Sequence, residues 1–155
     1  MAVKFKQYHR FDNAKAKYGV EHAIRDEANN YYGTIKTTLF DPHSQYTIVA
    51  TERYNRLHSE NAKAKGDYAN IFAFVELCVH DWKDVLDENG KQVKFSKEAA
   101  FELLTAKWDT GEVDEEGKAV EANNNWLADT LINLTRDVRN YQADPVATKA
   151  EAVKN

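Results

Sequence analysis

Cys78 and His80 are the pair whose side chains could supply a nucleophile and its base. A reactive thiol needs its base within hydrogen-bond reach. The apolar residues around this pair recur at helical spacing, and two residues along a helix lie about 200° apart around its axis. The two side chains would then point to opposite sides. We therefore expect a buried core cysteine beside a half-exposed histidine, and we predict no catalytic pair.

Metal ligands are the next kind of chemistry to consider. None of the spacings of zinc sites occurs among the remaining histidines, His9, His22, His43 and His58. Two acidic stretches carry a glycine where a calcium-binding loop would need one. With Gly90 as the sixth residue, the first ligand would be Val85, which has no side-chain oxygen. With Gly117, the twelfth position is Asn123, where a glutamate is expected. We predict neither a metal site nor a cofactor.

The glycines and serines form no pattern that accompanies phosphate binding or acyl transfer. The six glycines are scattered, and the sequence has no Gly-x-Ser-x-Gly elbow. With no nucleophile, metal or phosphate loop in the sequence, we predict that the protein is not an enzyme.

Three tryptophans, Trp82, Trp108 and Trp126, are candidates for a ligand-binding platform. Platforms that stack nucleic-acid bases normally carry positive charge. Here Trp108 precedes Asp109, Trp82 also lies among aspartates, and the net charge of the chain is −4. We therefore predict no nucleic-acid partner. The rings are expected to lie in the core or at a protein interface.

The length of 155 residues, with 43% hydrophobic and 30% charged residues, is typical of one soluble domain. We expect this domain to span residues 1–143, with residues 1–18 as a loosely docked arm and residues 144–155 as a mobile tail. The longest apolar run, residues 71–75, is too short for a membrane span, and the N-terminus has no hydrophobic signal segment. No membrane partner is expected, and the cytoplasm is the expected compartment.

The elements follow from hydrophobic periodicity and turn residues. A core helix is predicted over residues 68–86, because apolar side chains recur there at steps of three and four. Asn89-Gly90 predicts a type I′ turn, and a second helix should span residues 97–107. Residues 113–120 resemble residues 86–93 and predict a second hairpin of the same design. Asn124 or Asn125 should cap a last helix whose apolar seam runs from Leu127 to Tyr141.

The first third of the chain is rich in aromatic and β-branched residues. Two strands joined by a loop are predicted over residues 20–40, in an exposed or edge sheet. Residues 41–57 fit a helix and a strand about equally well, since Asp41-Pro42 favours a helix start and Thr47-Ile48-Val49 favours a strand. The predicted class is α+β, with small N-terminal antiparallel strands followed by a predominantly helical C-terminal half.

The segment from Val79 to Leu104 combines a tryptophan, an Asp-x-x-Gly-Lys turn, Phe-Ser and Leu-Leu. It resembles the signature of tail assembly chaperones of long-tailed (siphovirus-like) bacteriophages, and the likeness covers roughly Tyr68 to Tyr141. The resemblance implies a non-enzymatic protein of the host cytoplasm that binds the tape-measure protein. Such a chaperone keeps that protein soluble until tail-tube subunits assemble, and it is then absent from the virion.

An amphipathic tape-measure helix could be covered by spare apolar side chains of this chain. The candidate partner contacts are Trp82, Trp108, Trp126, Leu131 and Leu134, and packing in the core is the alternative for each. Two other functions stay open: a tail or head-tail connector subunit that remains in the particle, and an inhibitor of a host defence protein.

Overall fold

The computed structural model describes residues 11–58, 67–121 and 125–142. The helices and strands in chain order are α1 Asn13–Tyr18, β1 Val20–Arg25, β2 Tyr31–Thr37, α2 Gln45–Leu57, α3 Asp67–Cys78, β3 Val79–Lys83, α4 Lys97–Thr105, β4 Asp109–Val113, β5 Ala119–Glu121, α5 Trp126–Arg136 and the 3-10 helix η2 Val138–Tyr141. Helices and strands are mixed, as predicted. The strands are spread along the chain, however, and three of them lie beyond residue 78, so the expected division into strands followed by helices is wrong.

The main sheet has the order β1-β2-β3, with both pairs antiparallel. The two predicted strands of residues 20–40 are therefore confirmed as β1 and β2. β2 is the central strand, however, because β3 pairs along its second edge, and the expectation of an edge position fails for β2. Ile35 lies opposite His22 on β1 and Trp82 on β3. Ile35 is buried, as expected for a central strand.

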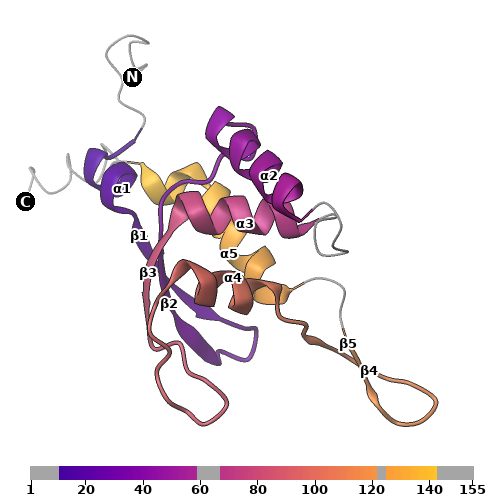
Figure 1. Ribbon diagram of the computed structural model, residues 1–155. Helices are drawn as coiled ribbons and strands as arrows, with labels where there is room; N and C mark the ends of the chain where they lie inside the picture. The colour runs from indigo at the N-terminus through magenta and orange to yellow at the C-terminus, as the bar shows by residue number, and fades with distance from the viewer. Residues whose placement is uncertain (1–10, 59–66, 122–124, 143–155) are drawn as a thin grey trace, which may run out of the picture.

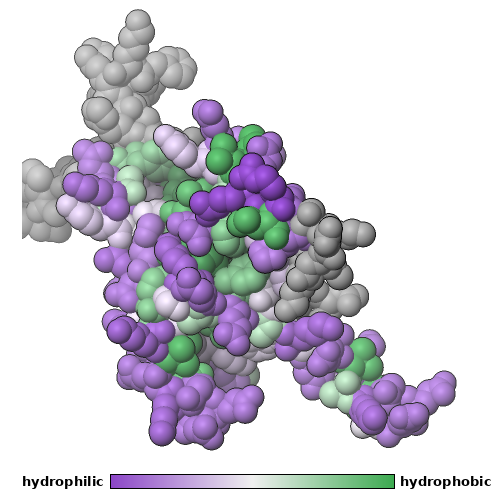
Figure 2. All heavy atoms as spheres, viewed as in Figure 1, coloured by the Kyte–Doolittle hydropathy of each residue, from purple (hydrophilic) through white to green (hydrophobic). Residues whose placement is uncertain are grey.

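Figure 1 shows α3, α4 and α5 gathered to one side of the sheet, with α2 lying outermost along α3. The β4–β5 hairpin projects away from this body. The space-filling view has a mainly hydrophilic surface, with apolar atoms visible over α2 (Figure 2). The core lies where the sheet meets the helices, and its largest fully buried side chains include Phe74, Leu104, Leu131 and Tyr141.

The predicted helix of residues 68–86 is right in its first half only. α3 ends at Cys78, and Val79 begins strand β3. Lys97 explains the stop, because its ammonium Nζ donates hydrogen bonds to the carbonyl oxygens of Val75 (2.8 Å) and Glu76 (3.1 Å) and also to that of Val79. A cation at a helix C-terminus satisfies carbonyls that would otherwise lack partners. Burial lowers the pKa of Lys97.

Three turns of the chain share one hydrogen-bond pattern, in which an aspartate opens a five-residue reversal. In each, Oδ1 of the aspartate accepts from the amides two and four residues later; the openers are Asp26, Asp87 and Asp114. The amide three residues on donates to the aspartate carbonyl. The fourth residue has a positive φ, at Asn29 (67°), Gly90 (79°) and Gly117 (81°). The predicted second hairpin is therefore confirmed.

The turn at Asn89-Gly90 differs from its prediction in type. A type I′ turn needs two residues of positive φ, and here only Gly90 has one, because Asn89 is held by the Asp87 carboxylate (2.8 Å). Leu86 and Gln92 form an isolated antiparallel bridge across the reversal. The chain reverses where expected, by a different local geometry.

For residues 41–57 the sequence left helix and strand open, and the structure shows a helix, α2. Its N-cap is Ser44, whose hydroxyl accepts from the Thr47 amide (3.1 Å), while Asp41 accepts from the amide of His43. Thr47 and Tyr54 face α3 and are buried. This packing outweighs the strand preference of the β-branched run.

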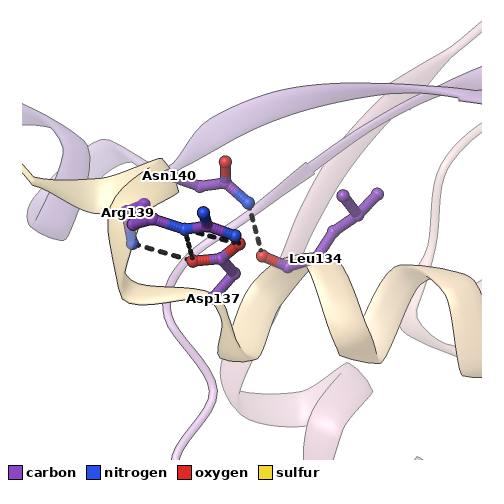
Figure 3. A network of polar contacts seen from close by, with 4 residues as sticks. All are labelled: Leu134, Asp137, Arg139 and Asn140. Carbon is purple, nitrogen blue, oxygen red and sulfur yellow. Dashed lines mark hydrogen bonds and ion pairs between the residues drawn. The ribbon is translucent and has the colours of Figure 1, made fainter.

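α5 begins at the predicted cap Asn125 and ends earlier than its apolar seam indicates. The helix stops at Arg136, and Asp137 then caps η2 by accepting from the amide and guanidinium of Arg139 (Figure 3). The Asn140 side chain donates to the carbonyl of Leu134 (2.8 Å), which closes the end of α5. Arg139 lowers the pKa of Asp137 through its hydrogen bonds. Tyr141 still reaches the core, but from η2.

Candidate partner-binding surface

Two of the five predicted contacts, Trp108 and Trp126, meet on the surface and are joined there by Tyr32, which the sequence did not single out. The ring centroids are 5.8 Å apart for the two tryptophans, 5.7 Å for Tyr32 and Trp108, and 5.5 Å for Tyr32 and Trp126. All three rings are half-buried. Their planes are inclined by 51° to 60°, so the rings do not form a parallel stack.

This cluster is the floor of a hollow of about 380 Å³, which we call the aromatic hollow. It is lined by Tyr32, Trp108, Trp126, Asp26, Glu27, Asp109 and Asp129. The lining comes from three separate parts of the chain: the β1–β2 turn with the start of β2, the junction of α4 with β4, and the first turn of α5 (Figure 1). Of the residues that the structure describes, four carboxylates and no basic side chain therefore line the hollow beside the three aromatic rings.

Asp26 connects the rim of the aromatic hollow to its floor. Its Oδ2 accepts from the Tyr32 hydroxyl and from the Asn30 side chain, each at 2.9 Å. Hydrogen bonds from Asn30 and then from Tyr32 lower the pKa of Asp26, while the same Asp26 carboxylate raises the pKa of Tyr32. Asp26 is therefore a fixed negative charge at neutral pH, and Tyr32 is a neutral phenol.

Trp82 lies apart from this cluster. Its indole Nε1 donates to the carbonyl of Val93 (2.7 Å), and its ring meets Phe95 edge to face at a centroid distance of 5.2 Å. The half-buried indole therefore closes the reversal after β3 and ties it to the segment before α4. Its contacts are those of a structural residue.

The two predicted leucine contacts differ in exposure. Leu131 is fully buried in the core cluster, and Leu134, one turn later on α5, is half-buried. Contact of Leu131 with a partner would require α5 to move. Core packing, the alternative named for each of the five residues, is therefore what the structure shows for Leu131.

Four of the eight exposed large apolar residues in the described part of the chain lie on α2, the segment for which the sequence left helix and strand open. The exposed fractions on α2 are 78% for Tyr46, 47% for Ile48, 57% for Val49 and 67% for Leu57. Tyr46, Val49 and Leu57 are separated by helical steps and lie on one side of α2, next to its buried side. Contiguous exposed apolar side chains mark interaction surfaces.

Beside this row lies a shallow groove of about 500 Å³ between α2 and α3, which we call the α2 groove. It is lined by Gln45, Tyr46, Val49, Ala50, Arg53, Glu76 and Leu77. The guanidinium of Arg53 pairs with the Glu76 carboxylate across it (3.8 Å) and stands over the Phe72 ring (5.4 Å). The α2 groove is thus mainly apolar and is crossed by the ion pair of Arg53 and Glu76.

The prediction that Cys78 and His80 point to opposite sides of one helix does not apply, because α3 ends at Cys78 and Val79 begins a strand. Cys78 ends α3, where its thiol contacts the Leu39 carbonyl (Sγ to O 3.6 Å) and burial raises its pKa to about 11. His80 lies on β3, and its Nε2 is 3.0 Å from the hydroxyl of Thr38. Within the described residues no group of three histidine, cysteine or acidic side chains could hold a metal ion. None of the described helices is long and apolar enough to cross a membrane.

The fold and these surfaces together define a small mixed α+β protein with one apolar and one acidic aromatic surface. The sequence of the YdaY prophage protein family matches residues 44–151, well over half of the chain. The chain belongs to this family and is a phage-derived protein. The match starts at Ser44, the N-cap of α2, so it includes the α2 groove, Trp108 and Trp126, and leaves Tyr32 outside. No curated protein and no solved structure matches the chain.

Proposed function

We propose that this prophage protein is a tail assembly chaperone that binds the tape-measure protein of a long-tailed phage and keeps it soluble during tail assembly. The proposal rests chiefly on one observation, the row of exposed apolar side chains on α2. Membership of a prophage protein family and the resemblance of residues 79–104 to tail assembly chaperones support the phage context. The role is one of binding without catalysis, in the host cytoplasm, with the tail-tube protein as a further partner.

The α2 surface fits an amphipathic helix as its occupant. A helix presents a stripe of apolar side chains along one face, and Tyr46, Val49 and Leu57, which lie three and eight residues apart, form such a stripe on one side of α2. The α2 groove beside them offers a place for one such side chain against Leu77. Burying roughly 400 Å² of apolar surface there would contribute about 10 kcal/mol before the costs of association, enough to compete with aggregation of the partner.

Coexpression tests the proposal directly. The tape-measure protein of the same prophage is produced with this protein or with its double variant Tyr46→Ser and Val49→Ser, and the soluble fraction is measured. The wild-type protein should keep the tape-measure protein soluble and copurify with it, and the double variant should do neither. Val113→Ser is the matched control, because Val113 is an exposed valine (68%, against 57% for Val49) on the β4–β5 hairpin.

Three results would overturn the proposal. The first is a tape-measure protein that precipitates equally with and without this protein. The second is detection of this protein in purified virions by mass spectrometry, which would indicate a structural tail or connector subunit. The third is recovery of a host nuclease complex in place of the tape-measure protein from infected cells, which would indicate an inhibitor of host defence.

A further inference from the structure

The aromatic hollow has a chemistry of its own that the proposed chaperone role does not use. Three aromatic rings line one space, and the face of an aromatic ring carries partial negative charge. Four carboxylates of Asp26, Glu27, Asp109 and Asp129 line the same space. Rings and rim therefore attract the same kind of ligand, a cation with a flat or apolar body.

The protein pairs cations with rings elsewhere. Arg25 stands over Tyr31 at 4.9 Å from the ring centroid, Arg53 over Phe72 at 5.4 Å, and Lys17 over Tyr18 at 5.2 Å. Among the described residues, no lysine or arginine lines the aromatic hollow. Lys107 is adjacent in sequence to Trp108, but its Nζ pairs with the Glu121 carboxylate at 3.6 Å on β5.

A metal ion is a poor occupant. No three carboxylates of the described chain come close enough to hold one, and Asp26 and Asp109 already accept backbone amides, with Asp109 bound to the Gly111 amide at 2.8 Å. Arginine fits better, because its planar guanidinium stacks on aromatic faces while its edges donate to carboxylates. Its weak hydration also lowers the cost of entering a half-buried site.

We propose that the aromatic hollow binds an arginine side chain from a basic segment of a partner protein. The guanidinium lies against Trp108 and Trp126 and donates hydrogen bonds to the carboxylates of the rim, Asp109 among them. Charge complementarity selects this occupant, since four acidic side chains line the aromatic hollow and none of the described basic residues does. The inference stands independently of the tape-measure proposal, because it concerns another face and another chemistry.

Indole N–H signals in ¹⁵N–¹H NMR spectra supply the test. The probe is a capped peptide of alternating alanine and arginine, and the control is the same peptide with neutral citrulline at each arginine position. The arginine peptide should shift the signals of Trp108 and Trp126 in a saturable manner. Trp82 is an internal control, because its indole donates to Val93 outside the aromatic hollow.

Three variants separate a built site from general attraction to an acidic protein. Asp109→Asn keeps an oxygen for the Gly111 amide and removes one charge, so it should weaken peptide binding about three- to fivefold, the effect of one exposed ion pair. Glu115→Gln removes a charge from the β4–β5 turn and should leave binding unchanged. Trp108→Leu keeps apolar bulk and should abolish the shift at Trp126.

The outcomes decide the inference in either direction. Selective shifts that depend on arginine and on Asp109 support it. Equal shifts at all three indoles, equal effects of the citrulline peptide, equal weakening by Glu115→Gln and Asp109→Asn, or no shift at millimolar peptide would each overturn it.

Discussion

The aromatic hollow and the outer side of α2 both place large apolar side chains at the surface, but they differ in how these side chains are held. In the hollow, Trp108 and Trp126 touch each other and Tyr32, and all three pack against the core cluster. On α2, Tyr46 and Val49 are exposed by 78% and 57%. Rings fixed by their neighbours can recognise a particular group, whereas loosely held side chains can adapt to many apolar stripes.

This difference has a consequence for stability. Side chains that already bury surface in the folded protein contribute to folding, and their removal leaves a void. Side chains that stand in water contribute little until a partner covers them. Substitutions in the aromatic hollow should therefore lower stability and partner binding together, and substitutions on α2 should lower partner binding alone.

The largest effect is expected at Leu131, in the core cluster against which the rings of the hollow pack. Leu131→Ala should lower the free energy of unfolding by about 3 kcal/mol, because the side chain is fully buried and its loss leaves a cavity. Val49→Ala on α2 should change it by no more than about 0.5 kcal/mol. Urea denaturation followed by circular dichroism measures both. Equal effects of the two variants would contradict the assignment of Leu131 to the core.

Trp126→Ala is expected to have the second largest effect. The ring is half-buried against Tyr32 and Trp108, so its loss should cost about 2 kcal/mol, less than for a fully buried tryptophan. Tyr46→Ala removes another large ring, but one exposed by 78%, and should be neutral for folding. Thermal unfolding of the two variants compares them directly. A neutral Trp126→Ala would show that the rings of the hollow do not pack as described.

Features that depend on local hydrogen bonds, such as helix caps and chain reversals, could be predicted from the sequence. The caps at Ser96 and Asn125 accept from amides three residues on, and the reversals at Asp87 and Asp114 are held by the carboxylate of their first residue. Each of these interactions lies within a few residues of chain. Residue types alone therefore sufficed to place them.

Features that depend on distant parts of the chain were missed. Residues 79–83 form a strand because β2 offers them an edge and because Lys97 ends α3, and neither partner is visible from the apolar spacing of the segment. The aromatic hollow combines Tyr32 with Trp108 and Trp126 from the other end of the chain. The acidic neighbour of Trp108 was the one signal for it, and that signal was used only to exclude nucleic acid.

The pH dependence of folding should reside in the core and not on α2. His22 is buried with its Nε2 3.2 Å from the Tyr141 hydroxyl, and burial lowers its pKa. Below the ordinary pKa of about 6.5, the unfolded chain binds a proton that folded His22 does not. Stability should therefore be complete above that pH and decrease as the pH falls through it. His80 lies at the surface on β3 and contributes in the same direction, since desolvation and then the charge of Lys97 lower its pKa.

Urea denaturation at pH 7.5 and 5.5 measures this effect. His22→Gln should reduce the difference in unfolding free energy between the two pH values, and His80→Gln should reduce it further. Val49→Ala should leave the difference as in the wild-type protein, because no part of the α2 groove contacts His22. A His22→Gln variant with the full wild-type difference would show that the buried histidine is not its source.

The smallest effect is expected in the turn that forms one wall of the aromatic hollow. Asn29 has a φ of 67° at the position that Gly90 and Gly117 occupy in the two related turns. Glycine adopts this conformation without the strain of a Cβ atom, so Asn29→Gly should raise the free energy of unfolding by about 0.5 kcal/mol. The reverse change Gly117→Asn, which meets nothing within 4 Å, should lower it by a similar amount. Thermal unfolding resolves both changes.

Asn29→Gly should also leave the arginine-peptide shifts of Trp108 and Trp126 intact, because the Asp26 carboxylate stays in place. A loss of these shifts would mean that the β1–β2 turn recognises the peptide through Asn29 instead of through the fixed charge of Asp26.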